Sequence, residues 1–211
     1  NGGKCNTEED FYKACRAASI LGTLQAGYTD FKFLTDTSKL IFDREALLGV
    51  SITGWMNNPD ILFNEKILEK GAQIVKDVNR EVSQIIGINA AARTTCVKPS
   101  GNASVLLQTA SGIHAEHSNM YIRNVQMNKE SEITQAIMKT NPYMVEESVW
   151  SSTGTDVVVS FPILPKKGSL YKDDLLGIKH LELVKKAQKH WVETGTNEDL
   201  CADKGIRHNV S

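Results

Sequence analysis

Segments with helical periodicity alternate along this chain with short segments rich in β-branched residues, and this alternation restricts the possible folds most strongly. Between Glu8 and Gln25, the apolar residues Phe11, Cys15, Ala18 and Leu21 recur at steps of three and four, which is typical of an amphipathic helix. Thr155–Phe161, with three consecutive valines, is the clearest strand. The alternation predicts an α/β fold with buried, largely parallel strands.

The remaining elements are predicted from the same signals and from residues that begin or end helices. Asp60 is expected to cap a long helix that ends near Gly87, and Asp174 to cap the last helix. Pro162 and Pro165 are expected to end the strand before them. The predicted core faces of these two helices consist of Ile67, Val75, Val78, Val82 and Ile85, and of Ile178, Leu181, Val184, Ala187 and Trp191. Further strands are expected at Ala46–Gly54, Thr94–Val97, Tyr121–Met127 and Arg207–Ser211, and a further helix at Glu130–Lys139.

The chain has 211 residues and contains no internal repeat, low-complexity segment or linker. It begins at Asn1 rather than at Met, and a strand pattern starts just before Ser211. We therefore expect residues 1–211 to form one partial domain, truncated at both ends.

Charge and cysteine content exclude several classes of protein. The 24 basic and 25 acidic residues give a net charge of −1, which argues against direct binding to nucleic acid or to an acidic membrane. No apolar run approaches the roughly 20 residues of a membrane helix, and the first residues do not resemble a signal peptide. Cys5, Cys15, Cys96 and Cys201 form no C-x-x-C pair, which predicts reduced thiols in a cytoplasmic protein without structural zinc.

The stretch from Cys96 to Ser104 carries the strongest indication of a binding site. A strand runs into the Pro99-Ser100-Gly101 turn, and small residues with short hydroxyls follow it. Such a turn can direct several backbone N–H groups at one anion, with the hydroxyls of Ser100 and Ser104 within reach. The Walker pattern is absent, and the same tripeptide is also common in ordinary turns.

Three other features leave alternatives open. His114 and His117 have the spacing of metal ligands and would suit a zinc hydrolase, but a polar loop lining a cleft is favoured because no third ligand is apparent. Cys5 lies outside any amphipathic stripe, where it is either a redox group or an incidental buried thiol. The segment from Tyr28 to Phe31 either lines a site or caps a helix.

Several of these segments together resemble a known family. They are Gly22–Phe31, Arg44–Gly54, Thr95–Gly101, Ser111–His114 and Tyr121–Arg123. In this order and spacing they are similar to the catalytic subunit of ribonucleotide reductase, specifically its adenosylcobalamin-dependent (class II) branch, over essentially the whole chain. The resemblance implies the later half of a ten-stranded α/β barrel. It also implies reduction of a ribonucleoside di- or triphosphate to the 2′-deoxyribonucleotide through a cysteine thiyl radical that adenosylcobalamin generates.

The resemblance also assigns roles to residues. Cys5 matches one cysteine of the reducing pair, and a thioredoxin-like protein is the implied reductant. The substrate-phosphate loop matches Pro99, Ser100, Gly101, Asn102, Ala103 and Ser104. The Ser111–His117 loop is implied to lie beside the same cleft, without a metal.

This chain departs from the family pattern in informative ways. The Asn-Pro-Cys-Gly-Glu motif that holds the radical cysteine is absent, as is the second reducing cysteine, so the chain by itself is expected to be inactive. Thr7 stands where leucine is common after Cys-Asn, and Asn102 stands where threonine is common after Pro-Ser-Gly. The di-iron-dependent branch with the same barrel, and a nucleotide-binding module without catalysis, are the remaining alternatives. The rest of the catalytic subunit is an implied partner.

Overall fold

The computed structural model describes residues 1–101 and 103–199, which form two compact units. The first unit consists of Asn1–Glu116 together with the chain from Lys166 onward, and the second of His117–Pro165. The predicted roles of Asn102 and Cys201, and the predicted strand at Arg207–Ser211, lie outside the described residues. The expectation of a single partial domain concerns a larger protein and stays a prediction.

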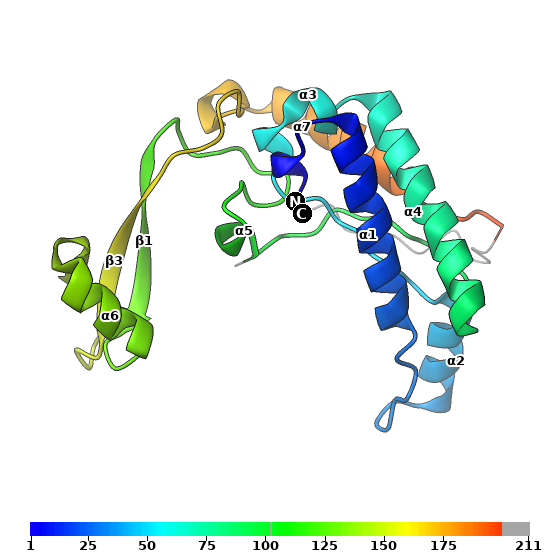
Figure 1. The fold of residues 1–211 in the computed structure, drawn as a ribbon, viewed down its shortest axis with the longest axis horizontal. Helices are drawn as coiled ribbons and strands as arrows, with labels where there is room; N and C mark the ends of the chain where they lie inside the picture. Colours follow the sequence, from blue (N-terminus) through cyan, green and yellow to red (C-terminus); the bar gives the residue numbers. More distant parts are fainter. Residues whose placement is uncertain (102, 200–211) are drawn as a thin grey trace. The chain divides into compact units, whose positions relative to one another are not determined.

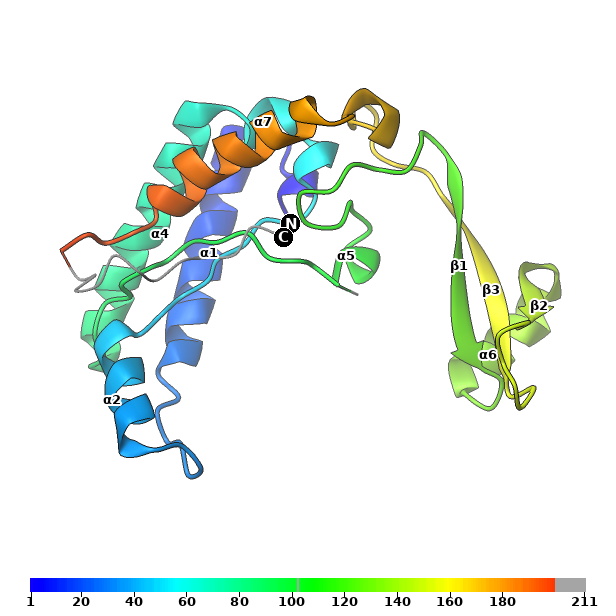
Figure 2. The same ribbon diagram turned by 180° about the vertical axis from the view of Figure 1, so that it is seen from behind.

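Two long helices, α1 (Glu8–Ala26) and α4 (Glu65–Ile86), lie side by side in the first unit (Figures 1 and 2). Both agree with the predicted helices. Thr7 and Asp10 form a capping box at the start of α1, and Gly87, at φ 76°, ends α4. The helices approach closely at Gly71, where a Cβ atom would lie 2.5 Å from Cε1 of Phe11.

Two details of the predicted α4 were wrong. Asp60 does not cap it: a short helix, α3 (Pro59–Leu62), comes first, and the side chain of Asn64 accepts the capping hydrogen bond from Ile67 N. Ile85, expected on the core face, is 76% exposed because it lies in the last turn of the helix.

The segments expected as strands at Ala46–Gly54 and Thr94–Val97 run parallel but form only an isolated bridge, between Val50 and Thr95. Val50 N donates to Thr94 O over 2.9 Å, and Cys96 N donates to Val50 O over 3.0 Å. On one face of the first segment, Leu48, Val50 and Ile52 are buried against the helices. The buried parallel pairing was therefore predicted correctly, but it does not extend into a regular ladder.

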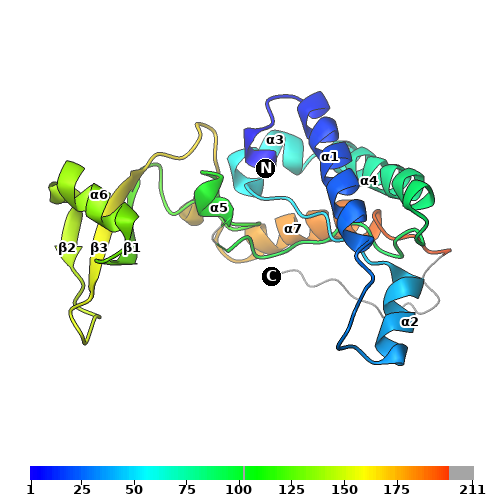
Figure 3. The same ribbon diagram turned by 60° about the horizontal axis from the view of Figure 1, so that its bottom comes forward.

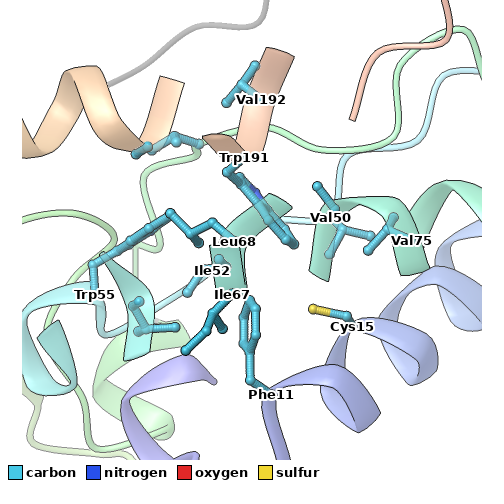
Figure 4. Packing of buried hydrophobic residues seen from close by; sticks show 14 of the residues in the cluster. Phe11, Cys15, Val50, Ile52, Trp55, Ile67, Leu68, Val75, Trp191 and Val192 are labelled. Carbon is cyan, nitrogen blue, oxygen red and sulfur yellow. The ribbon is translucent and has the colours of Figure 1, made fainter. Parts of the chain in front are cut away.

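The last helical stretch of the first unit consists of α7 (Ile178–Ala187) and a π-helical turn, η5 (Gln188–Glu193). Trp191 is fully buried in the core cluster shown in Figure 4, where its ring centroid lies 5.9 Å from that of Phe11. Ile178 and Leu181, predicted on the same buried stripe, are 74% and 65% exposed. Asp174 does not cap α7; its carboxylate accepts a hydrogen bond from Tyr171 N instead.

Shorter elements complete the first unit. They are η1 (Gly2–Lys4), α2 (Asp36–Glu45), η2 (Trp55–Asn57), α5 (Ala103–Leu106) and η4 (Lys172–Asp174).

The second unit contains a three-stranded sheet in the order β1-β3-β2, in which both pairings are antiparallel. Its strands are β1 (Tyr121–Asn128), β2 (Val145–Glu147) and β3 (Asp156–Ile163). The prediction of largely parallel strands was thus wrong for this sheet. Only the short segment 148–155 joins β2 to its neighbour β3, and a short return of this kind suits an antiparallel pair. Helix α6 (Glu132–Thr140) lies against the sheet (Figure 3), and a short turn, η3 (Pro142–Met144), follows it.

The predicted strands and helix in this unit agree with β1, β3 and α6, but Pro162 does not end β3. It pairs with Ile122 of β1 inside the strand. A proline is tolerated there because β2 covers only Val157–Val159, so that β3 has no second neighbour at Pro162. In the residues that the structure describes, no helix is both long and apolar enough to cross a membrane.

Candidate functional site

The loop after Val97 is anchored at its start and open at its tip. Lys98 N donates to the side chain of Ser51 over 3.0 Å. Gly101, exposed and at φ 49°, turns the chain into α5, and a Cβ atom at this glycine would meet nothing within 4 Å. The backbone N–H groups of Gly101 and Ser104 have no acceptor among the described residues. These amides are therefore the groups that this loop offers to an anion.

The hydroxyl groups of the loop already make hydrogen bonds within the protein. Ser100 Oγ accepts a hydrogen bond from Gly112 N over 2.9 Å and lies 2.9 Å from Ser111 Oγ. Ser104 Oγ is buried and donates to Gly101 O over 3.0 Å. The hydroxyls thus hold the shape of the loop, in addition to any contact with a ligand.

The structure brings two of the sequence motifs together at this point. Gly112 has φ 50°, and a Cβ atom there would lie 3.0 Å from Lys98 O. The loop around Gly112 can approach Lys98–Ser100 this closely because glycine has no side chain and adopts positive φ. The two motifs thus lie against each other, and the expectation that Ser111–His117 borders the substrate cleft stays a prediction.

Cys5 follows η1 and is only 5% exposed. Burial raises the pKa of its thiol above the ordinary value. The N-terminal amino group opposes this increase, Asp10 adds to it, and Lys166 opposes it more weakly. Its carbonyl oxygen accepts a hydrogen bond from Asn58 Nδ2 over 2.7 Å. At neutral pH, Cys5 is therefore a protonated thiol in a fixed turn.

The turn that carries Cys5 contacts the chain that follows the loop. Asn1 Nδ2 donates to Leu107 O over 3.1 Å, just after α5. A Cβ atom at Gly3 would lie 2.5 Å from the Thr109 hydroxyl, so these segments touch. The fold thus places both candidate features from the sequence, Cys5 and the Pro99–Ser104 loop, on adjoining segments.

A buried asparagine, Asn57, holds the chain that follows the loop. Its Oδ1 accepts hydrogen bonds from Thr109 Oγ1 (2.7 Å) and Ala110 N (2.6 Å). Its Nδ2 donates to Glu116 Oε1 (2.8 Å) and to Ser169 Oγ (2.9 Å). The amide thereby uses all four of its hydrogen-bonding positions. The sequence analysis did not identify this residue as part of a site.

The other described cysteines are buried and behave as packing residues. Cys15 lies on the core face of α1, where burial, assisted by Cys5, raises the pKa of its thiol to about 12. Burial also raises the pKa of Cys96, with an opposing effect of Lys98. Neither thiol is ionised near neutral pH, which is typical of unreactive cysteines.

The pKa of Cys15 leads to a testable dependence of stability on pH. Above an unfolded-state pKa of about 8.5, the unfolded chain loses a proton that the folded chain keeps, so the free energy of unfolding falls as pH rises. The contribution of Cys15 falls by up to about 1.4 kcal/mol per pH unit until the pH reaches about 12. Urea denaturation at several alkaline pH values should show this fall in the wild-type chain and a shallower one in Cys15→Ala. Equal slopes would contradict it.

The two histidines considered as metal ligands have different neighbours. The ring centroid of His114 lies 6.5 Å from that of His180, whereas His117 packs edge-on against Tyr121 in the second unit. Within residues 1–101 and 103–199, no group of three or more His, Cys, Asp or Glu side chains is arranged to hold a metal ion. The described residues therefore give no support to a zinc hydrolase.

A hollow of about 720 Å³ lies beside the extended segment 47–51, and the sequence analysis did not predict it. The second half of α1 and the aromatic residues Tyr28, Phe31 and Phe42 form its walls, and Lys98 contributes to its lining. Of the two roles considered for Tyr28–Phe31, the structure thus supports the lining of a cavity. The periodicity of α1 could have revealed this site only in part, through apolar residues such as Leu21 that stay exposed.

Comparison with known proteins relates the chain to one group of enzymes. It is 28% identical over 191 residues to a "Probable adenosylcobalamin-dependent ribonucleoside-triphosphate reductase" of Dictyostelium discoideum, covering 88% of this chain and 24% of that protein. It is 24% identical over 169 residues to the adenosylcobalamin-dependent ribonucleoside-triphosphate reductase of Euglena gracilis, covering 79% and 23%. A protein of the same name from Lactobacillus gasseri is 27% identical over 135 residues, covering 64% and 16%. No family model matches the chain.

Among solved structures, the chain matches a B-12 dependent (class II) ribonucleotide reductase with a TM-score of 0.71 at 16% identity, over 84% of this chain and 29% of that one. The structural match shows a shared fold and confirms the α/β class. The names of the curated relatives confirm the resemblance predicted from the motifs. The chain spans about a quarter of the length of the first two curated relatives.

Proposed function

We propose that this chain, a relative of the adenosylcobalamin-dependent ribonucleotide reductases, is the part of such an enzyme's catalytic subunit that holds the substrate phosphates and supplies one reducing cysteine. The phosphate loop in this proposal consists of Pro99, Ser100, Gly101, Asn102, Ala103 and Ser104, and the reducing cysteine is Cys5. The substrate is a ribonucleoside di- or triphosphate.

One observation carries the proposal: the turn of Cys5 and the chain that follows the phosphate loop are in direct contact. Asn1 bonds to Leu107, and Gly3 lies against Thr109. These residues are more than a hundred positions apart, so only the fold brings them together. A ribonucleotide held by its phosphates at the Gly101 and Ser104 amides would extend its sugar over a neighbouring surface, and the Cys5 turn adjoins the chain that follows that loop and α5.

The state of the Cys5 thiol suits reduction of a ribose. The buried thiol keeps its proton at neutral pH. Two thiols together provide two electrons and two protons: the 2′-hydroxyl leaves as water, hydrogen takes its place on carbon, and the sulfurs join in a disulfide. The second thiol of this pair belongs to another part of the protein, and a thioredoxin-like protein would reduce the disulfide again.

An unpaired backbone edge supports the proposed partial barrel. In the segment 46–52, Leu48 and Val50 donate to Arg93 and Thr94. The alternate residues Leu47, Gly49 and Ser51 donate no backbone hydrogen bond to any described residue. The hollow of about 720 Å³ lies along the same residues. A further strand from the remaining part of the catalytic subunit fits this edge, and a ten-stranded α/β barrel would contain such a strand.

The cofactor of the proposed enzyme is adenosylcobalamin, the cofactor in the names of the curated relatives, and those names favour it over the di-iron branch. Bound to the whole enzyme, it would supply the radical. The hollow along the segment 46–52 does not fit this cofactor. Cobalamin carries several amide side chains around its ring, whereas apolar and aromatic side chains form most of the hollow near Lys98. We therefore place its contacts outside this chain.

The phosphate loop can be tested with Ser100→Leu in the full-length protein. Loss of the hydroxyl that orients Gly112 N, together with the added bulk at the loop entry, is expected to raise KM for the nucleotide by about tenfold, with a smaller change in kcat. Steady-state kinetics measure both parameters. Ser104 is a poorer target because it is buried, so that a large side chain there would disturb packing.

A suitable control is Ser152→Leu, at an exposed serine in the second unit. It should leave KM unchanged. Equal KM values for Ser100→Leu and the wild type would contradict the assignment of this loop.

A further inference from the structure

Asn58, the residue after Asn57, binds the turn that carries Cys5. Asn58 Nδ2 donates to Cys5 O over 2.7 Å and to Gly2 O over 3.3 Å, the carbonyl groups at the two ends of the Cys5 turn. Asn57 meanwhile binds Thr109 and Ala110, in the chain that follows the phosphate loop and α5. Two consecutive side chains thus bind the two features that the proposed reaction needs together.

The hydrogen bonding of Asn58 differs from what its position in the helix favours. It stands at the N-cap of α3, where an asparagine normally accepts a hydrogen bond from the helix backbone. Here the side chain makes no capping bond. Its amide is directed to the Cys5 turn instead, at the expense of the local interaction that its position favours.

Close packing leaves this region little freedom to shift. Gly54, at φ 78°, precedes η2, and a Cβ atom there would lie 2.0 Å from Thr109 Oγ1 and 3.1 Å from the backbone of Gly3. A Cβ atom at Gly3 would lie 3.1 Å from Cβ of Asn57. The Cys5 turn, the η2 turn and Thr109 are therefore in van der Waals contact, and the two asparagines join them by hydrogen bonds.

We propose that Asn57 and Asn58 are positioning residues: Asn57 fixes the chain that follows the phosphate loop and Asn58 fixes the Cys5 turn, so that one rigid turn sets the distance between substrate phosphates and reducing thiol. Neither side chain needs to touch the substrate. The kinetic part of this inference rests on the proposed function, but the restraint on Cys5 does not.

The substitution Asn58→Asp tests the restraint in the full-length protein. Aspartate has the same shape and is as good an N-cap as asparagine, so α3 should be retained. It has no N–H group to donate, and its carboxylate would face the carbonyl of Cys5. We expect alkylation of Cys5 by iodoacetamide, followed by peptide mass spectrometry, to become about tenfold faster, the factor that corresponds to one net hydrogen bond.

The same change at another helix start provides the matched control. Asn64 caps α4 with its side-chain oxygen, which aspartate also supplies, and Asn64→Asp should leave the alkylation rate of Cys5 at the wild-type value. Serine also caps helices, but its shorter side chain places the donor farther from Cys5 O. Asn58→Ser should therefore also accelerate alkylation of Cys5. Circular dichroism of each variant checks that the helices are retained.

Kinetics then separate this inference from the proposed function. In an active wild-type enzyme, Asn58→Asp should lower kcat by about tenfold and leave KM within about twofold, because Asn57 still holds the phosphate side. Faster alkylation of Cys5 without reductase activity in the wild type would support the positioning role and contradict the proposed function. Wild-type alkylation rates in both Asn58→Asp and Asn58→Ser would overturn the positioning role.

Discussion

In the full-length protein, Cys5→Ser is expected to stop the reaction after at most a single incomplete turnover. Serine has nearly the same size and hydrogen-bonding capacity as cysteine, so the turn held by Asn58 should persist. Serine cannot form a disulfide, so the two electrons that reduce the ribose are not available. We expect the steady-state rate of deoxyribonucleotide formation to fall by about a thousandfold or more.

The measurement compares product formed per enzyme during the first turnover with product formed at steady state, in the presence of a dithiol reductant. Cys15→Ala is the control, since this thiol is buried in the helix interface and takes no part in the proposed reaction. Sustained turnover by Cys5→Ser would show that Cys5 is not a reducing cysteine. It would leave a nucleotide-binding role for the loop as the remaining interpretation.

The largest expected effect on stability is that of Trp191→Ala. Trp191 is completely buried, and its indole N–H donates to Cys96 O over 3.3 Å. Its ring packs against Phe11 at an interplanar angle of 48°. Removing it leaves a cavity between α1 and η5, and substitutions of this kind cost about 3–5 kcal/mol in the free energy of unfolding. The cost would be a large fraction of the stability of an ordinary domain.

Trp150→Ala offers a control with the same chemical change. Trp150 is 83% exposed, so its loss should alter the free energy of unfolding by less than about 0.5 kcal/mol. Urea denaturation followed by far-UV circular dichroism compares the two variants. Similar midpoints for Trp191→Ala and Trp150→Ala would contradict the packing described for η5.

Local signals account for the elements that were predicted correctly. The three-to-four spacing of apolar residues identified α1, and Gly87 marked the end of α4 because positive φ suits glycine. Alternation of side chains identified β1 and β3. The predicted N-caps were wrong, because aspartate is a common capping residue but neither Asp60 nor Asp174 lies at a helix boundary of this kind. Asn64 occupies the N-cap position of α4, and Gly177 that of α7.

The sequence alone thus determined the helices, the clearest strands, the resemblance to the class II reductases, and the candidate residues Cys5 and Pro99–Ser104. These conclusions depend on neighbouring residues or on ordered motifs, both of which can be read along the chain. Only the tertiary structure decided that the Cys5 turn adjoins Thr109, that the Ser100 hydroxyl binds Gly112, and that Asn57 and Asn58 join the two sides. The reason is physical. Some of these contacts link residues more than a hundred positions apart, and they form only because the packing of the whole core brings the segments together.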